Sequence, residues 1–271
     1  MNTLPHFVDC ASFGVRFRLA ADSAALLGRM LECTPFGTQP SADSHPDAER
    51  FTLLCDNERS YRLLVGEEPV AEAPELQPVL IRLTTDLMVH VANYAPDRVF
   101  MHAGVIGWQD RALLLPGTSF AGKTTLVAEL VRAGATYYSD EYAVLDEHGR
   151  VHPYPRELQM RQPGGREQTP MSVKQLQGYA GTASLPVSHV VFANFVEGSQ
   201  WEPQPVSAGL AVLEMLRHSI PVQRTPARVM ATLAKMMESA TALASERGEA
   251  PETARALLLA MSEGGPEGVS R

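Results

Sequence analysis

A glycine-rich stretch in the middle of the chain has the residue types that are needed to hold a phosphate group. The segment LLLPGTSFAGKTTL, residues 113–126, contains the pattern G-x-x-x-x-G-K-[ST] from Gly117 to Thr124. Its two glycines allow the backbone to curl so that several N–H groups point toward one anion. An apolar run precedes the pattern and a helical segment follows it, which is the strand–loop–helix context that the pattern requires. This context argues against the alternative, a chance match in a surface loop.

We expect this loop and the start of the following helix to bind a nucleotide. Lys123 would add a mobile charge that reaches the β- and γ-phosphates, and Thr124 would present a hydroxyl to Mg²⁺. The positive end of the helix would face the same anion. The predicted nucleotide-binding residues are Gly117, Thr118, Ser119, Phe120, Ala121, Gly122, Lys123, Thr124 and Thr125.

Two neighbouring acidic residues, Asp140 and Glu141, follow in the segment TYYSDEYAVLD. Adjacent residues of a strand point to opposite faces, so both carboxylates can serve one site only if the strand ends there. One carboxylate could then take a proton from an attacking hydroxyl while the other supports Mg²⁺. The alternative is a solvated turn at a strand edge. A GTPase would also need an N-K-x-D motif to recognise its base, and the sequence has none.

His102 is the third candidate, in the apolar segment FMHAGVIGW that precedes the glycine-rich loop. A histidine in an apolar strand is most often a core residue whose polar atoms are satisfied. Its place just ahead of the loop favours a role in the same site.

The elements that must position these residues alternate between strands and helices, which predicts an α/β fold. Apolar or alternating segments predict strands, and apolar residues at helical spacing predict helices. The predicted strands are RVFMHAGVIGW, RALLLPG, TYYSDEYAVLD, RVHPYPRELQMR and SHVVFANF. The predicted helices are KTTLVAELVRAG, residues 206–218, residues 225–244 and PETARALLLAM, and residues 162–184 are predicted to form a long loop.

The N-terminal part is predicted to be a small α+β module without a chemical motif. It contains expected strands at 12–20, RFTLLCD and YRLLVGE, and expected helices at 21–32 and 73–95. The composition changes near Asp97. We therefore predict a module at 1–94, a catalytic domain at 95–262 and a flexible tail at 263–271.

The composition of the whole chain limits the expected partners. The 271 residues are 45% hydrophobic and carry a formal net charge of −8, so a chain-wide basic surface for nucleic acid is not expected. No signal-peptide pattern and no run of about 18 apolar residues occurs, which predicts a cytoplasmic protein without a membrane partner. The three cysteines are odd in number and have no metal-ligand spacing, which favours a reducing compartment.

Three of these segments together resemble the catalytic domain of HPr kinase/phosphorylase. They are HAGV, PGTSFAGKTTL and AGATYYSDEYAVL, and the resemblance covers residues 98–161. It implies a P-loop kinase domain of the HPr kinase/PEP carboxykinase type with a mixed sheet. The later segments HVVFANFVEGSQWEPQPVS and SERGEAPETARALL resemble HPr-kinase-related proteins of bacterial gene neighbourhoods, some of which phosphorylate a serine of a lasso peptide.

The resemblance implies a kinase that uses ATP and Mg²⁺ to phosphorylate a serine or threonine hydroxyl of a protein or peptide, modified-peptide precursors included. It also implies a homo-oligomer. By position, Asp140 would be the base, with His102 and Lys123 as the other catalytic residues. Thr124 and Glu141 would be the metal ligands. The same region suggests Arg156 and Arg161 for the acceptor, with ordinary surface charge as the alternative.

The sequence departs from the family pattern at two places. Phe120 stands where the family's loop usually has a third glycine, and the acidic pair is Asp-Glu in place of Asp-Asp. Two alternative functions therefore stay open, a catalytically weak nucleotide-binding regulator or scaffold, and a small-molecule kinase.

Overall fold

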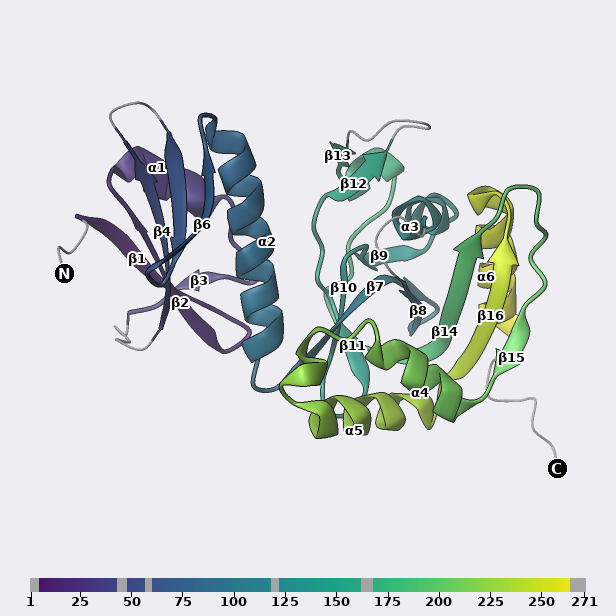
Figure 1. The fold of residues 1–271 in the computed structure, drawn as a ribbon. Coiled ribbons are helices and arrows are strands. Elements are labelled where there is room, and N and C mark those ends of the chain that lie inside the picture. Colours follow the sequence, from purple (N-terminus) through teal and green to yellow (C-terminus); the bar gives the residue numbers. More distant parts are fainter. Residues whose placement is uncertain (1–4, 43–47, 57–59, 118–121, 162–167, 264–271) are drawn as a thin grey trace. The chain divides into compact units, whose positions relative to one another are not determined.

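A break in packing between Asp97 and Arg98 divides the chain into two units (Figure 1). The computed structural model describes residues 5–42, 48–56, 60–117, 122–161 and 168–263. Both units combine helices with mixed sheets, so the chain belongs to the mixed α/β class. None of the helices in the described ranges has both the length and the apolar character needed to cross a bilayer.

The first unit is a six-stranded sheet with two helices. Its strands are β1 (His6–Ser12), β2 (Val15–Ala21), β3 (Gln39–Pro40), β4 (Glu49–Cys55), β5 (Tyr61–Val65) and β6 (Glu68–Ala73), in the order β3-β1-β2-β4-β5-β6. The helices are α1 (Ala24–Leu31), which packs against β2, and α2 (Leu76–Tyr94), which packs against β5 and β6.

The strand predicted at 12–20 starts later than expected. Phe13 and Gly14 have φ values of 47° and 78°, so they form the turn between β1 and β2 and do not continue the strand. Strand β1 itself was not predicted. Ser23 caps α1 by accepting the N–H of Leu26, and the neighbouring Asp22 accepts the N–H of Cys55.

The second unit contains an eight-stranded sheet whose main order is β11-β10-β7-β8-β14-β16-β15, with β9 paired to β7. Strands β8, β14 and β16 run parallel, and the other pairings are antiparallel. The strands are β7 (Val99–Trp108), β8 (Arg111–Pro116), β9 (Thr136–Ser139), β10 (Tyr142–Leu145), β11 (Arg150–His152), β14 (Leu185–Phe195), β15 (Gln204–Val206) and β16 (Thr241–Arg247).

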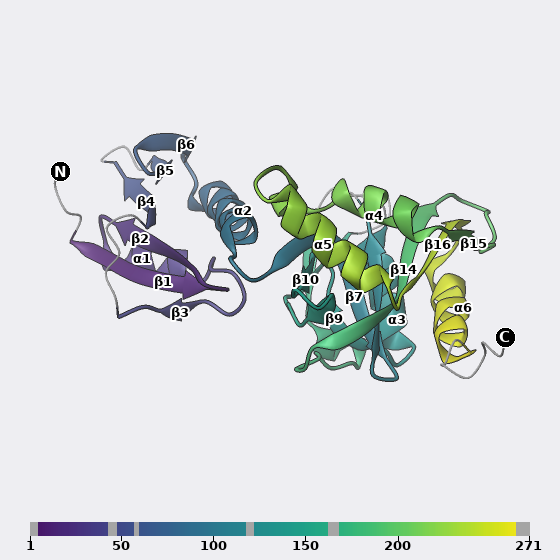
Figure 2. The same cartoon turned by 90° about the horizontal axis from the view of Figure 1, so that it is seen from below.

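Helices cover both faces of this sheet and complete a three-layer arrangement (Figures 1 and 2). Helices α4 (Ala208–Leu216) and α5 (Pro226–Met237) pack on one face through a core that includes Met215 and Leu233. Helices α3 (Lys123–Arg132) and α6 (Ala250–Glu263) pack on the other face through a core that includes Leu126 and Leu257.

Several predictions for the second unit are wrong. The segment RVHPYPRELQMR forms two separate strands, β11 and β12, and the segment TYYSDEYAVLD forms β9 and β10. The helix predicted at 225–244 ends at Met237, and the chain continues as β16, because this segment completes the parallel sheet beside β14. The long loop predicted at 162–184 contains β13 (Gln168–Met171), which pairs with β12 (Leu158–Arg161), and the short 3-10 helix η1 (Val173–Leu176). The predicted tail, apart from Glu263, lies outside the described residues.

Candidate functional site

The parallel strands place the glycine-rich loop at one edge of the sheet. Strand β8 ends at Pro116, and α3 begins at Lys123 with Gly122 before it in a left-handed conformation at φ 76°. The carboxyl ends of β8, β14 and β16 meet at this edge, which is where open α/β sheets bind ligands. Four predicted nucleotide-binding residues lie outside the described part of the chain, namely Thr118, Ser119, Phe120 and Ala121.

The side chain of Lys123 contacts Gly117, which lies just after β8. Lys123 is only 9% exposed, and its Nζ donates a hydrogen bond of 2.8 Å to the carbonyl of Gly117. Burial lowers the pKa of Lys123 to about 8, although Glu141 and Asp140 favour the charged form. A buried ammonium has few water contacts to lose, so a phosphate oxygen would be a strongly favoured partner. Thr125, one residue beyond Thr124 in the first turn of α3, is exposed.

A break between β9 and β10 brings the two acidic residues to this edge. Strand β9 ends at Ser139, and β10 begins at Tyr142. The Ser139 hydroxyl accepts the N–H groups of Glu141 and Tyr142 at 3.1 and 2.9 Å, which fixes the corner. Strand β9 therefore ends just before Asp140 and Glu141. A strand end at this place is what a shared site for both carboxylates requires.

Asp140 is the buried member of the pair, at 6% exposure. Its Oδ1 accepts a 3.0 Å hydrogen bond from the hydroxyl of Tyr137, and its carboxyl is also hydrogen-bonded to the side chain of Thr124. Burial raises the pKa of Asp140, while these two hydrogen bonds and the charge of Arg156 act in the opposite direction. The result is a carboxyl group that holds its proton more strongly than an exposed aspartate does.

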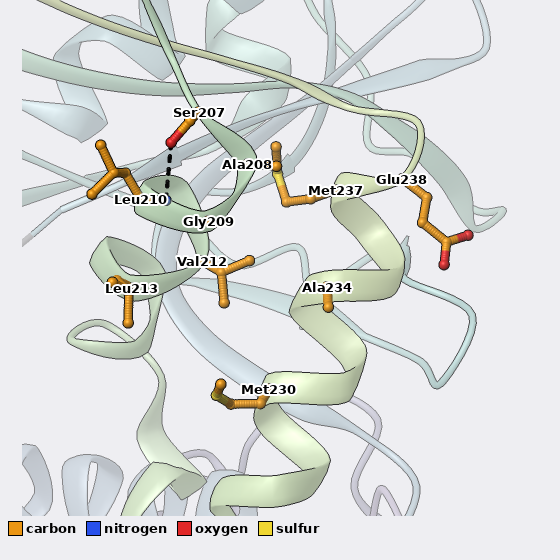
Figure 3. A pocket seen from close by; sticks show the side chains of 10 residues that line it. All are labelled: Ser207, Ala208, Gly209, Leu210, Val212, Leu213, Met230, Ala234, Met237 and Glu238. Atoms are coloured by element: carbon orange, nitrogen blue, oxygen red, sulfur yellow. Dashed lines mark hydrogen bonds between the residues drawn. The ribbon is translucent and has the colours of Figure 1, made fainter.

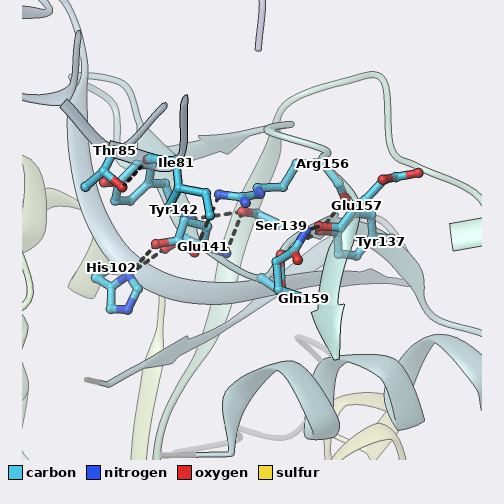
Figure 4. A network of polar contacts seen from close by, with 11 residues as sticks. Ile81, Thr85, His102, Tyr137, Ser139, Glu141, Tyr142, Arg156, Glu157 and Gln159 are labelled. Atoms are coloured by element: carbon cyan, nitrogen blue, oxygen red, sulfur yellow. Dashed lines mark hydrogen bonds and ion pairs between the residues drawn. The ribbon is translucent and has the colours of Figure 1, made fainter. Parts of the chain in front are cut away.

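Glu141 lies between a histidine and an arginine, as Figure 4 shows. Its Oε1 is 3.4 Å from Nδ1 of His102, and its Oε2 is 3.7 Å from Nη1 of Arg156. The Glu141 side chain is 31% exposed, so it is the more accessible of the two carboxylates. It therefore links two predicted site residues that come from different strands and loops.

His102 is a neutral imidazole whose two nitrogen atoms differ in their surroundings. Its pKa is lowered to about 4, first by burial and then by the charge of Lys123. Nδ1 lies 3.0 Å from the backbone carbonyl of Glu141, so Nδ1 carries the proton. The other nitrogen, Nε2, is buried and has no hydrogen-bond partner among the described residues. This differs from the satisfied core histidine that was the alternative interpretation.

The backbone of His102 is held on both sides. Its N–H donates to the carbonyl of His218 at 2.7 Å, and its carbonyl accepts the N–H of Gly117 at 3.4 Å. His218 follows α4, and its charged form would repel that of His102. The sequence segment around His218 predicts only a connection between helices, and no local motif indicates this neighbour.

Thr124 and Glu141, the two predicted metal ligands, have different contacts. The carboxyl group bonded to the Thr124 side chain belongs to Asp140, whereas Glu141 contacts His102 and Arg156. Arg156 thus lies at the site. Arg161 ends β12, and its side chain lies outside the described part of the chain.

The oxygen atoms of Thr124 and Asp140 fit Mg²⁺, which prefers hard oxygen ligands and keeps several waters or phosphate oxygens. Within the described ranges, no group of three or more His, Cys, Asp or Glu side chains could hold a metal by itself.

Two side chains near the loop were missed as site residues. Tyr137 carries no motif signal. Arg247 ends β16, and no local pattern in the sequence indicates its contact with Gly122.

No family model matches the chain, and no curated protein matches it.

A separate apolar groove lies between α4 and α5 (Figure 3). It has a volume of about 760 Å³ and is lined by Ser207, Ala208, Gly209, Leu210, Val212, Leu213, Met230, Ala234, Met237 and Glu238. These two helices cover the sheet face opposite to α3, so the groove is not part of the site around Lys123.

Proposed function

We propose that the chain is an ATP- and Mg²⁺-dependent kinase of the P-loop type, similar to HPr kinase/phosphorylase, that phosphorylates a serine or threonine hydroxyl of a protein or peptide. The observation that supports this most strongly is the position of the acidic pair. Asp140 is hydrogen-bonded to Thr124 in the first turn of α3, and Lys123 interacts electrostatically with both Asp140 and Glu141. A phosphate-binding sequence and a pair of carboxylates thus occupy one edge of the sheet.

The residues around Gly117 and Gly122 would bind the nucleotide. Lys123 would exchange its bond to the Gly117 carbonyl for the phosphate oxygens, and the N-terminal end of α3 would face the same anion. Bound Mg-ATP would supply the transferable phosphoryl group and part of the charge that balances it. The hydroxyl of Thr124 would face the metal side of that complex.

Asp140 is also the proposed proton acceptor for the incoming hydroxyl. Its raised pKa makes it a stronger base than an exposed aspartate, which is what general-base catalysis near neutral pH needs. Glu141 would keep His102 and Arg156 in place through its two oxygens. The metal role predicted for Glu141 stays a prediction.

The Nε2 atom of His102 would accept a hydrogen bond within the site. A neutral imidazole with its proton fixed on Nδ1 can only accept at Nε2. The acceptor hydroxyl of the substrate, or a water near the γ-phosphate, is a donor of the right chemistry. Arg156 forms an ion pair with Glu141 and has a side chain that is 27% exposed. It would therefore contact the acceptor protein or peptide.

The experiment that tests this proposal is transfer of γ-labelled phosphate from ATP to serine-containing peptides, with Asp140→Asn beside the wild type. Asp140→Asn should lower transfer by about 100-fold or more while nucleotide affinity stays within a few-fold, because the base acts on the acceptor. Asp110→Asn is the matched control, because Asp110 is an exposed turn residue at φ 59°, which asparagine adopts readily. Normal transfer by Asp140→Asn would show that the base is assigned wrongly, and ATP binding without transfer to any acceptor would favour the regulator or scaffold function.

A further inference from the structure

Arg247 is a buried arginine at the carboxyl end of β16, and it contacts the end of the glycine-rich loop. It is 3% exposed. Its Nη2 donates to the carbonyl of Gly122 at 2.9 Å, and its Nη1 donates to the carbonyl of Gly248 at 2.9 Å. The guanidinium also lies 5.3 Å from the ring centroid of Phe195. Two carbonyls and an aromatic face thus compensate the burial of this charge.

The sheet explains why this arginine reaches the loop. Phe195 and Arg247 are partners in the parallel register of β14 and β16, so both end at the edge where β8 leads into the loop. The N–H of Val196 donates to the carbonyl of Arg247 at 2.9 Å, which fixes the arginine backbone to the neighbouring strand. The guanidinium is therefore carried by the sheet and not by the loop that it contacts.

The contact with Gly122 determines the direction of the next amide group. In a trans peptide the C=O and N–H bonds point in opposite directions. A fixed Gly122 carbonyl therefore fixes the direction of the Lys123 N–H, which lies at the N-terminal end of α3. The same carbonyl accepts the N–H of Leu126 at 3.1 Å, so it also closes the first turn of the helix.

Gly122 fits this contact because it has no side chain. A Cβ at this position would lie 2.4 Å from Nη2 of Arg247, and the φ of 76° is one that other residues rarely adopt. The glycine and the arginine thus depend on each other for their geometry.

We propose that Arg247 is a positioning residue that holds Gly122 so that the N-terminal amides of α3 face the nucleotide phosphates. The proposal rests on the proposed function for the identity of the anion. The geometric part, the hold on Gly122 and the first turn of α3, stands without it.

The test combines hydrogen exchange with nucleotide binding in Arg247→Met and Arg247→Lys. In Arg247→Met, exchange of the Leu126 amide should accelerate, and affinity for Mg-ADP should fall at least about tenfold, because a hydrogen bond from a charged group is lost. Arg247→Lys should recover part of this affinity, because lysine can still donate to Gly122. Arg132→Met is the matched control at the other end of α3 and should leave both values unchanged.

The results separate this inference from the proposed function. A wild type that binds no nucleotide contradicts the function, and unchanged Leu126 exchange in Arg247→Met then overturns the positioning role independently. If the wild type binds Mg-ADP and both Arg247→Met and Arg247→Lys bind it as tightly as the wild type does, the positioning role is also overturned. If Arg247→Met does not fold, the affinity of Arg247→Lys for Mg-ADP is compared with that of Lys123→Met, which lacks the proposed phosphate-binding ammonium. An affinity between those of the wild type and Lys123→Met supports the role of Arg247, and wild-type affinity overturns it.

Discussion

The hydroxyl of Tyr137 lies 3.0 Å from Oδ1 of Asp140, and it lies 2.9 Å from the backbone carbonyl of Arg156. A phenol carries one proton, so it cannot donate fully to both oxygens at once. When Tyr137 donates to the Arg156 carbonyl, its contact with Asp140 is satisfied only if Asp140 carries a proton. This pair thus provides a structural reason for a carboxyl group that can take up and release a proton.

Tyr137→Phe should therefore change the pH dependence of phosphate transfer. The hydrogen bond from Tyr137 lowers the pKa of Asp140, so its loss raises that pKa further. The base must be deprotonated, and the acidic limb of the rate profile should move to higher pH with a lower rate at pH 7. Tyr138→Phe is the control, because its hydroxyl donates to the carbonyl of Ala183. A profile identical to that of the wild type would argue against Asp140 as the base.

Nucleotide affinity should depend on pH through Lys123. Its pKa is lowered to about 8, so the charged form is present below pH 8 and decreases above it. A bound phosphate favours the ammonium, so affinity for Mg-ADP should fall by up to tenfold per pH unit as the pH rises above 8. Calorimetry at several pH values, with Lys123→Met for comparison, measures this. Equal slopes in the two proteins would exclude Lys123 as the source.

The stability of the folded chain should rise between pH 4 and 6.5 because of His102. The folded-state pKa is about 4 and the ordinary value is 6.5, so the unfolded chain binds more protons in this window. This contribution is complete above pH 6.5 and is lost as the pH falls toward 4. Denaturant unfolding at pH 4.5 and pH 7 should show a smaller pH difference for His102→Gln than for the wild type. The exposed His148→Gln should retain the full difference.

Gly122→Ala should strongly weaken nucleotide binding. The new methyl group would displace the Arg247 guanidinium, and the residue would have to keep a left-handed conformation. We expect affinity for Mg-ADP to fall by more than about tenfold. Gly28→Ala is a useful contrast, because a Cβ there has no atom within 4 Å and lies within α1, so stability should increase by about 0.5–1 kcal/mol. Unchanged binding by Gly122→Ala would contradict the close contact with Arg247.

The parts of the site that are near one another in sequence could be predicted from it. The glycine spacing predicts the loop and the helix after it. A shared role for Asp140 and Glu141 requires only that a strand ends next to them. The Ser139 hydroxyl produces that end by capping two backbone N–H groups, a local interaction that the segment SDEY is able to form.

The parts that depend on the assembled sheet could not be predicted. Arg247 reaches Gly122 only because β16 lies next to β14, and the segment TALASER has residues that favour a helix as much as a strand. The neighbours of His102, His218 among them, likewise come from distant parts of the chain. Pairings of this kind are set by the packing of the whole unit and leave no local pattern.

Binding of ATP, ADP and AMP to the wild type, to Lys123→Met and to the exposed control Lys235→Met tests the central claim most directly. The claim is that the glycine-rich loop and Lys123 hold the terminal phosphates of a nucleotide beside Asp140. Calorimetry with Mg²⁺ should show that ATP and ADP bind much more tightly than AMP, and that only Lys123→Met weakens them, by about tenfold or more. Equal affinity for ATP and AMP, or normal ATP binding by Lys123→Met, would contradict the claim.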